Sequence, residues 1–249
     1  MTTENTPLPR PSIIVDHVTK EFRKRKTRSL KDLLISVVRR TSGGAQFFRA
    51  LHDVSFTIAE GESVAIIGYN GSGKSTTLKL ISGVLEPDEG NVYTRGRVAG
   101  LIEVGAGFHP DLTGRENVFL NAAILGMSRE ETEARFDEIV AFSEIGDFID
   151  QEVSHYSSGM FMRLAFSVAI HVELDILLVD EVLAVGDAPF RRKCVEKIKE
   201  LTASGVTMVV VSHSKGMVKS LCQRGIVINK GAVIFDGPID EALTHVETK

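Results

Sequence analysis

The chain has 249 residues, a length that suits one large α/β domain, or a main domain with an inserted subdomain, better than two unrelated domains. Its hydrophobic content of 43% and charged content of 25% exclude a disordered or fibrous chain, and its formal net charge of -4 gives no general case for nucleic-acid binding. Cys194 and Cys222 are too few and too distant for a disulfide framework or a zinc site, which suits a reducing cytosol, and no apolar run approaches the ~20 residues of a membrane span.

Short apolar runs recur along the chain and predict buried strands at residues 13–15, 54–58, 64–67, 176–179 and 208–211. Helical stretches are expected between them, at residues 75–81, 129–143, 161–170 and 191–201. Near the end of the chain, residues 226–229 and 233–235 flank Asn229-Lys230-Gly231 and predict a hairpin. The alternation of strands and helices predicts a doubly wound α/β sheet.

Two segments interrupt this alternation. Residues 29–40 carry an apolar stripe at helical spacing, and residues 20–40 hold nine basic and two acidic residues. The stripe predicts an amphipathic helix in an insertion of about residues 23–49, suited to an anionic lipid surface, although an ordinary surface helix fits it equally well. Residues from about 104 to 170 are mostly helical, as an inserted helical subdomain would be.

One glycine-rich run follows the predicted strand at 64–67 and precedes a predicted helix: Gly68-Tyr69-Asn70-Gly71-Ser72-Gly73-Lys74-Ser75-Thr76. This pattern is typical of a phosphate-binding loop, whose backbone N–H groups point inward at phosphates. Lys74 is expected to reach the β and γ phosphates of ATP, and the Ser75 hydroxyl to bind Mg²⁺. A glycine-rich turn that only connects a strand to a helix is the alternative, and the Lys-Ser pair in register disfavours it.

Asp180 and Glu181 follow the apolar run at 176–179, so a strand delivers both carboxylates to the edge of the sheet where α/β proteins bind ligands. Asp180 is expected to hold Mg²⁺ through water, and Glu181 to act as the general base that activates the attacking water. Two exposed carboxylates at a strand end are the alternative, which the nearby phosphate loop makes unattractive.

The run Tyr156-Ser157-Ser158-Gly159-Met160 opens a predicted helix about 20 residues before Asp180. A serine side chain and a glycine N–H at a helix N-terminus form an anion site, although the same residues also make a plain helix start. Between the phosphate loop and Asp180, this run resembles the signature of the ATP-binding-cassette (ABC) family.

The resemblance implies roles for four further residues. His213 stands where the family carries a switch histidine that contacts the γ-phosphate and the attacking water. Asp187 matches the D-loop that touches the opposite subunit, and Glu103 replaces the glutamine that contacts water and Mg²⁺. Phe22 lies near the position of an aromatic residue that stacks on adenine, with core packing as its alternative.

The resemblance narrows to the ATPases that export O-antigen, teichoic acid and related lipid-linked polysaccharides. It rests on four stretches of sequence, namely residues 96–110, 112–117, 156–160 and 180–187. It implies one ABC nucleotide-binding domain over residues 1–249, with a mainly parallel sheet core and antiparallel β region at 12–103 and 171–249 and a helical subdomain at about 104–170. The chain ends too soon after the hairpin to be expected to carry the C-terminal carbohydrate-binding domain of some exporters.

This reading predicts an ATP- and Mg²⁺-dependent homodimer at the cytoplasmic face of the plasma membrane. Its partners would be two copies of a membrane-spanning permease and a lipid-linked polysaccharide, with no nucleic acid. The alternatives are an importer or small-solute or lipid exporter ATPase, a soluble ABC protein of translation or DNA maintenance, and a catalytically dead subunit. The second usually needs two cassettes or a long coiled coil, and the third is opposed by Lys74, Asp180, Glu181 and His213.

Overall fold

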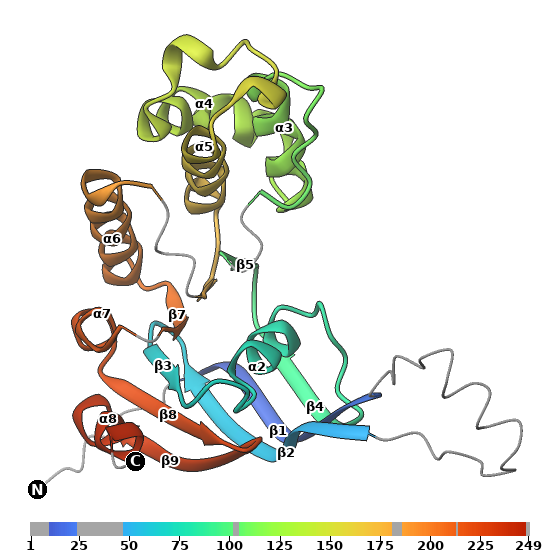
Figure 1. The fold of residues 1–249 in the computed structure, drawn as a ribbon, viewed down its shortest axis with the longest axis vertical. Helices are drawn as coiled ribbons and strands as arrows, with labels where there is room; N and C mark the ends of the chain where they lie inside the picture. Colours follow the sequence, from blue (N-terminus) through green and yellow to red (C-terminus); the bar gives the residue numbers. More distant parts are fainter. Residues whose placement is uncertain (1–9, 24–46, 102–104, 181–185, 213, 248–249) are drawn as a thin grey trace, which may run out of the picture.

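The structure, a computed structural model, describes residues 10–23, 47–101, 105–180, 186–212 and 214–247 (Figure 1). The amphipathic helix predicted at residues 29–40 lies outside these ranges. The described residues form a six-stranded sheet, a three-stranded sheet beside it, and helices that cover the larger sheet or gather at one end of the molecule (Figure 1).

The larger sheet is mainly parallel, as predicted. Its strand order is β5 (Val98–Gly100), β6 (Ile176–Val179), β7 (Thr207–Val211), β3 (Ser63–Ile67), β8 (Arg224–Asn229) and β9 (Ala232–Pro238). Only β9 runs antiparallel to its neighbour. The predicted hairpin is therefore confirmed. Its two-residue turn, Lys230-Gly231, has positive φ at both positions, which is the type I′ geometry that matches strand twist.

The smaller sheet is antiparallel and has the order β2 (Phe47–Ala59), β1 (Pro11–Arg23) and β4 (Glu89–Thr94). The strands predicted at 13–15 and 54–58 were much too short, because beyond those runs buried residues such as Val18 and Leu51 are separated by exposed ones and leave no continuous apolar run. Arg23 belongs to β1 and residues 47–49 belong to β2, and the rest of the insertion predicted at about residues 23–49 lies outside the described residues. Residues His17 and Asp53, both with positive φ, mark irregularities in this pairing.

Seven α-helices and two short 3₁₀ helices occur among the described residues. They are α2 (Lys74–Ile81), α3 (Gly114–Ile124), α4 (Arg129–Ser143), η1 (Gly146–Phe148), η2 (Val153–His155), α5 (Ser158–His171), α6 (Ala188–Ala203), α7 (Lys215–Leu221) and α8 (Ile239–Glu247). The limits predicted for α4 are confirmed, and those predicted for α5 and α6 were short by one to three residues at each end. None of these helices is long and apolar enough to cross a membrane.

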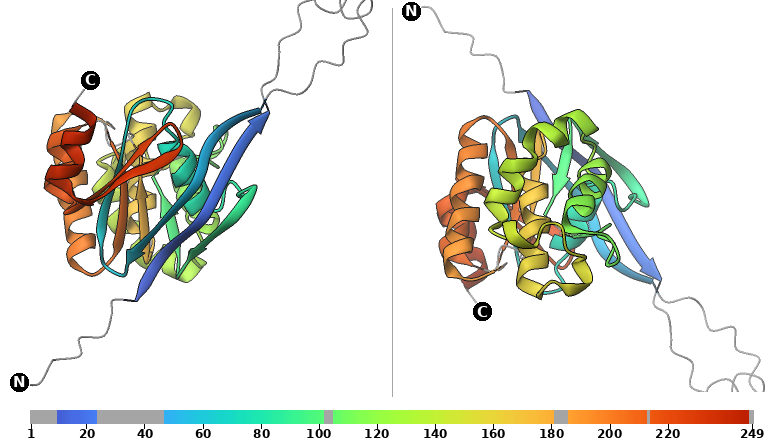
Figure 2. Two further views of the ribbon diagram at one scale, coloured as in Figure 1. Left: turned by 90° about the horizontal axis from the view of Figure 1, so that it is seen from below. Right: turned by 90° about the horizontal axis from the view of Figure 1, so that it is seen from above.

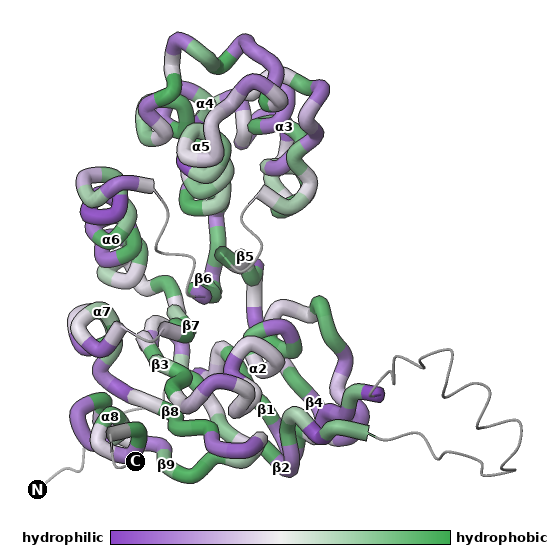
Figure 3. The backbone as a smooth tube through the Cα atoms, viewed as in Figure 1, coloured by the Kyte–Doolittle hydropathy of each residue, from purple (hydrophilic) through white to green (hydrophobic). Residues whose placement is uncertain are grey.

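The larger sheet is buried on both faces. Successive residues of a strand point to opposite sides, so neighbouring residues pack into different cores. On β3, Ala65 and Ile67 face a core shared with α5, α6, α7 and α8, whereas Val64 and Ile66 face a core shared with α2 and the antiparallel sheet. Figure 2 shows this layering, and Figure 3 shows the hydrophobic strands at its centre. The sheet is thereby fixed from both sides.

Helices α3, α4 and α5 have a core of their own, built from Val118, Ala122, Ile139, Leu164 and Val168. Capping boxes begin α3 at Thr113 and α4 at Ser128, where the cap hydroxyl and a glutamate three residues later exchange hydrogen bonds with the backbone. The group lies at the opposite end of the molecule from the antiparallel sheet (Figure 1). The division of the chain at about residues 104 and 170 stays a prediction.

Arg224 joins the two sheets. Its guanidinium pairs with both carboxylate oxygens of Asp236 at 2.6 and 2.7 Å, and its Nη1 donates to Glu62 Oε1 at 3.0 Å and to the Thr57 carbonyl at 3.1 Å. Hydrogen bonds from Arg224 to Asp236 hold the pKa of the guanidinium above its usual range. The Arg224 side chain is only 27% exposed. Its removal would therefore leave the carboxylates of Glu62 and Asp236 without their partner in a half-buried position.

We expect Arg224→Met to lower the free energy of unfolding by about 2 kcal/mol, since charge-assisted hydrogen bonds at a partly buried site are lost. Urea unfolding of the two proteins measures this change. Arg129→Met is the matched control, because Arg129 also pairs with a carboxylate but is 81% exposed, and it should change stability by less than about 0.5 kcal/mol. Equal effects of the two substitutions would contradict the role of Arg224.

Candidate functional site

The glycine-rich run connects β3 to α2 and is pressed against two other strands. A Cβ atom on Gly68 would lie 2.1 Å from the Ile228 carbonyl oxygen of β8. One on Gly73 would lie 2.6 Å from Leu51 Cδ2 and 2.8 Å from the Ala50 carbonyl oxygen of β2. Both glycines also have positive φ, so the loop follows a path that no other residue type allows at these two points.

The loop carries the donor groups that an anion requires. No side chain caps α2, so the N–H groups of its first turn have no side-chain acceptor. Lys74 is only 6% exposed, and its Nζ donates to the carbonyls of Gly68 at 2.9 Å and Tyr69 at 3.0 Å. The Ser72 hydroxyl is buried and lacks a hydrogen-bond partner among the described residues. Together with Ser75 and Thr76 at the helix start, this donor set fits a nucleotide phosphate.

Three parallel strands of the larger sheet end at one edge, beside the phosphate loop. Ile66 of β3 lies opposite Val211 of β7, and Val210 lies opposite Val179 of β6. The chain therefore leaves these strands at Gly68, Ser212 and Asp180 along the same edge of the sheet. Glu103, Glu181 and His213 lie outside the described residues, and their roles stay predictions.

The predicted signature residues lie at the start of α5. Ser157 is the N-cap, its hydroxyl accepting the Met160 N–H at 3.1 Å, and Ser158 and Gly159 form the first turn. Ser157 and Ser158 are exposed. Whereas α2 lies beside the antiparallel sheet, α5 belongs to the helices at the other end of the molecule, so the structure does not bring the signature to its own phosphate loop (Figure 1).

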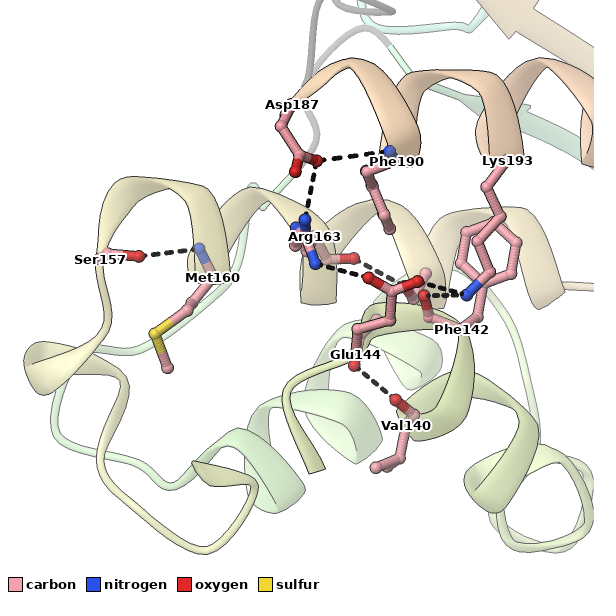
Figure 4. A network of polar contacts seen from close by, with 11 residues as sticks. Val140, Phe142, Glu144, Ser157, Met160, Arg163, Asp187, Phe190 and Lys193 are labelled. Carbon is pink, nitrogen blue, oxygen red and sulfur yellow. Dashed lines mark hydrogen bonds and ion pairs between the residues drawn. The ribbon is translucent and has the colours of Figure 1, made fainter. Parts of the chain in front are cut away.

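Asp187, predicted to touch an opposite subunit, caps α6 within its own chain. Its Oδ1 accepts the Phe190 N–H at 3.3 Å and pairs with Arg163 at 2.7 Å (Figure 4). Desolvation raises the pKa of Asp187, but the hydrogen bonds from Phe190 and Arg163 and the charge of Arg163 outweigh it and hold that pKa below its usual range. The carboxylate is thus ionised, and its Oδ1 is held by contacts within its own chain.

A hollow of about 400 Å³ lies beside the phosphate loop. It is lined by Asn70, Gly71 and Ser72 of the loop, by Asn229 and Lys230 of the hairpin, and by Tyr69 and His245. The Tyr69 hydroxyl donates to the Val246 carbonyl in the last turn of α8 at 2.8 Å, which ties the loop to a distant part of the chain. The sequence pattern gave no signal for this contact, because it accepts any residue at position 69.

Phe22 lies directly opposite Phe48 in the pairing of β1 with β2. Both rings are exposed, by 38% and 45%, and the Lys20 ammonium lies 5.8 Å from the centre of the Phe22 ring. Two residues after Phe48, the Ala50 carbonyl reaches the phosphate loop at Gly73. Core packing, the alternative considered for Phe22, is therefore wrong. Sequence reasoning missed Phe48, although the aromatic pair Phe47-Phe48 stands at the start of a strand.

A family model described as "ABC transporter" matches residues 51–184. The chain belongs to the ABC transporter family. This confirms the family resemblance recognised in the sequence, and the P-loop α/β fold with a mainly parallel sheet agrees with it.

Curated relatives and solved structures agree with this family assignment. The ABC transporter protein AbcA of Aeromonas salmonicida is 52% identical over 80% of this chain, which spans 64% of that relative's length. The O-antigen export system ATP-binding protein RfbB of Klebsiella pneumoniae is 48% identical over 88% of this chain and 90% of its own. A solved dimer of the ATP-binding cassette MJ0796 bound to ADP and Pi superposes with a TM-score of 0.72 at 26% identity, covering 91% of this chain and 98% of that one.

The exposed Phe22–Phe48 pair leads to a prediction about how the adenine base of ATP is bound. We expect Phe22→Ala to weaken ATP binding by about tenfold, because one base stacked on one aromatic ring contributes about 1–3 kcal/mol. Binding of inorganic tripolyphosphate, which has no base, should be unchanged. Isothermal titration with both ligands measures the difference, and Phe148→Ala, which removes a 45% exposed phenylalanine near the helical group, is the control.

Phe48→Ala, tested in parallel, shows whether the second ring shares the base. Loss of tripolyphosphate binding along with ATP in Phe22→Ala would mean that the ring supports the loop rather than the adenine.

Proposed function

We propose that this chain is the ATP-hydrolysing subunit of an ABC transporter that exports a lipid-linked polysaccharide across the cytoplasmic membrane. The observation that carries the proposal is similarity to an O-antigen export ATP-binding protein along nine-tenths of that protein's length. The four stretches of sequence that resemble polysaccharide exporters support the same choice of substrate class.

The phosphate loop binds the nucleotide in this proposal. Lys74 exchanges its bonds to the Gly68 and Tyr69 carbonyls for the β and γ phosphates, which costs little because an ammonium group keeps its number of acceptors. Among the described residues no group of three or more His, Cys, Asp or Glu is arranged to hold a metal ion. Mg²⁺, when bound, would be held by Ser75 and, through water, by Asp180, as the position of these residues in the two motifs suggests.

Hydrolysis needs a base and a group that orients water. Glu181 accepts a proton from the attacking water, His213 contacts the γ-phosphate and the same water, and Glu103 completes the contacts to water and metal. Mg²⁺, when bound, neutralises charge on the phosphate oxygens. The parallel strands β3, β6 and β7 support this arrangement, because they direct Gly68, Asp180 and Ser212 to one edge.

Two copies of the chain form the working ATPase in this proposal. The signature residues Ser157, Ser158 and Gly159 lie on α5, away from the phosphate loop of their own chain, so they are free to close over the nucleotide of a partner (Figure 1). Asp187 meets the partner near the same place. The dimeric state of the MJ0796 cassette supports this assembly. Two copies of a permease hold the dimer at the cytoplasmic face of the membrane.

Glu181→Gln tests the ATPase directly. The variant should bind ATP normally and form a stable ATP-dependent dimer, while kcat falls by about 10²- to 10⁴-fold, because the amide cannot accept the proton of water. Phosphate release and size-exclusion chromatography with ATP measure the two effects. Turnover near that of the wild type would remove Glu181 from this role.

The export assignment has its own test in cells. Deleting the gene should remove a surface polysaccharide and leave its lipid-linked form inside the cell, because synthesis continues while export stops. A plasmid with the wild-type gene should restore the surface glycan, and one with Glu181→Gln should not. Unchanged surface glycan together with loss of a small solute's transport would favour another class of ABC transporter.

A further inference from the structure

Arg163 lies in α5, five residues after the signature serine Ser158, and contacts two carboxylates on other helices. Its Nη2 lies 2.7 Å from Asp187 Oδ1, and its Nη1 lies 2.8 Å from Glu144 Oε2. Figure 4 shows the guanidinium between the two carboxylates. The planar guanidinium presents donors in two directions at once, which a lysine ammonium cannot match in geometry.

The first contact connects the signature helix to the turn before α6. Asp187 Oδ1 also accepts the Phe190 N–H, so the oxygen that holds Arg163 is the oxygen that caps α6. In the sequence, Asp187 closes the short segment that begins with Glu181, the proposed general base. A displacement of Arg163 therefore acts on the end of that segment.

The second contact connects α5 to the end of α4. Glu144 ends α4 in a left-handed conformation with φ of 59°, and its Oε1 also accepts Lys193 Nζ of α6 at 3.1 Å. Lys193 Nζ donates as well to the Phe142 carbonyl at 3.0 Å. Lys193 and Arg163 hold the pKa of Glu144 below its usual range, so the carboxylate is charged at neutral pH.

An aromatic contact fixes the Arg163 side chain between these partners. Its guanidinium carbon lies 4.9 Å from the centre of the Phe190 ring, and the side chain is only 21% exposed. Phe190 itself is buried against Phe142 and Phe166. Arg163 is thus held in one position by charge, hydrogen bonds and a ring face, while the side chains of its partners Glu144 and Asp187 are 49% and 57% exposed.

We propose that Arg163 is a positioning residue that makes the two ATP sites of the dimer cooperative. When the partner's nucleotide contacts the signature at the start of α5, Arg163 transmits the resulting movement to the Asp187 turn. The inference rests on the proposed function. Because a helix moves as a rigid rod over a turn and a half, a displacement at the start of α5 reaches Arg163 undiminished. Asp187 must then follow, since otherwise its ion pair with Arg163 is lost.

A matched ion pair elsewhere separates this role from a merely structural one. Arg135 of α4 pairs with Glu173, just after α5, at 2.8 Å, with similar chemistry and a half-exposed side chain. That pair also fastens the helical group to the following segment, but it does not contact Asp187. An effect that came from stability alone would appear in both variants, to a smaller extent for Arg135, which makes one ion pair where Arg163 makes two.

The experiment compares the full-length chain with its Arg163→Gln and Arg135→Gln variants. The rate of ATP hydrolysis against ATP concentration gives kcat and the Hill coefficient, and fluorescent nucleotide titration gives the Kd. Hydrogen exchange of the backbone amides of residues 187–192 is measured with and without ATP in the Glu181→Gln background, in which the nucleotide is not consumed.

Arg163→Gln should lower kcat by about tenfold and bring the Hill coefficient towards one, while the Kd stays within about twofold. The ATP-dependent change in exchange of residues 187–192 should also disappear, and Arg135→Gln should keep all of these properties. Arg163→Lys should recover part of kcat, because it keeps the charge and one contact.

A cooperative wild type with an unchanged Arg163→Gln variant overturns the inference alone. A wild type that does not hydrolyse ATP overturns the proposed function as well, so the two failures are distinct. If Arg163→Gln does not fold, Asp187→Asn takes its place, because it removes the ion pair with Arg163 while the amide oxygen can still accept the Phe190 N–H that caps α6. Full cooperativity in that folded variant would likewise overturn the inference.

Discussion

The close approach of the phosphate loop to β8 and β2 is the constraint on which the site depends. Gly68 meets the Ile228 carbonyl, and Gly73 meets Leu51 and the Ala50 carbonyl, at distances that leave no room for a Cβ atom. These contacts join the larger sheet, the antiparallel sheet and α2 at one point. Three residues before Leu51, β2 carries Phe48, which lies opposite Phe22 of β1.

Much of this arrangement could be predicted from sequence because its signals are local. Lys74 and Ser75 in register, the serine that caps α4 and the Lys230-Gly231 turn each fix their own surroundings. The exposed halves of β1 and β2 could not be predicted, since backbone pairing there leaves no apolar period. The start of α3 was missed although its Thr113–Glu116 capping box was readable. The contact of Tyr69 with Val246 could not be predicted, and neither could those of Arg163 with Asp187 and Glu144, because the partners lie far apart in the sequence.

The helices α3 to α5 are connected to the rest of the chain through two kinds of contact. Phe142 of α4, Phe166 of α5 and Phe190 of α6 form a cluster of rings with centres 5.8–6.4 Å apart, which tolerates sliding because apolar contacts have little direction. The ion pairs of Arg163 and Lys193 lie directly beside this cluster and are directional. The rings supply cohesion, and the ion pairs set the orientation of α5 relative to α6.

The combination of apolar and ionic contacts between α5 and α6 bears on how the two ATP sites of the proposed dimer can influence each other. A wholly apolar contact between α5 and α6 would let the signature helix settle on a partner's nucleotide without informing the Asp187 turn. A wholly ionic contact would resist the movement, since partly buried charges lose much when separated. With Phe190 serving both as a ring under Arg163 and as the residue whose N–H caps onto Asp187, movement of α5 and adjustment of the α6 start become one event. In the proposed dimer, this coupling would let closure over one nucleotide prepare the residues that flank the other.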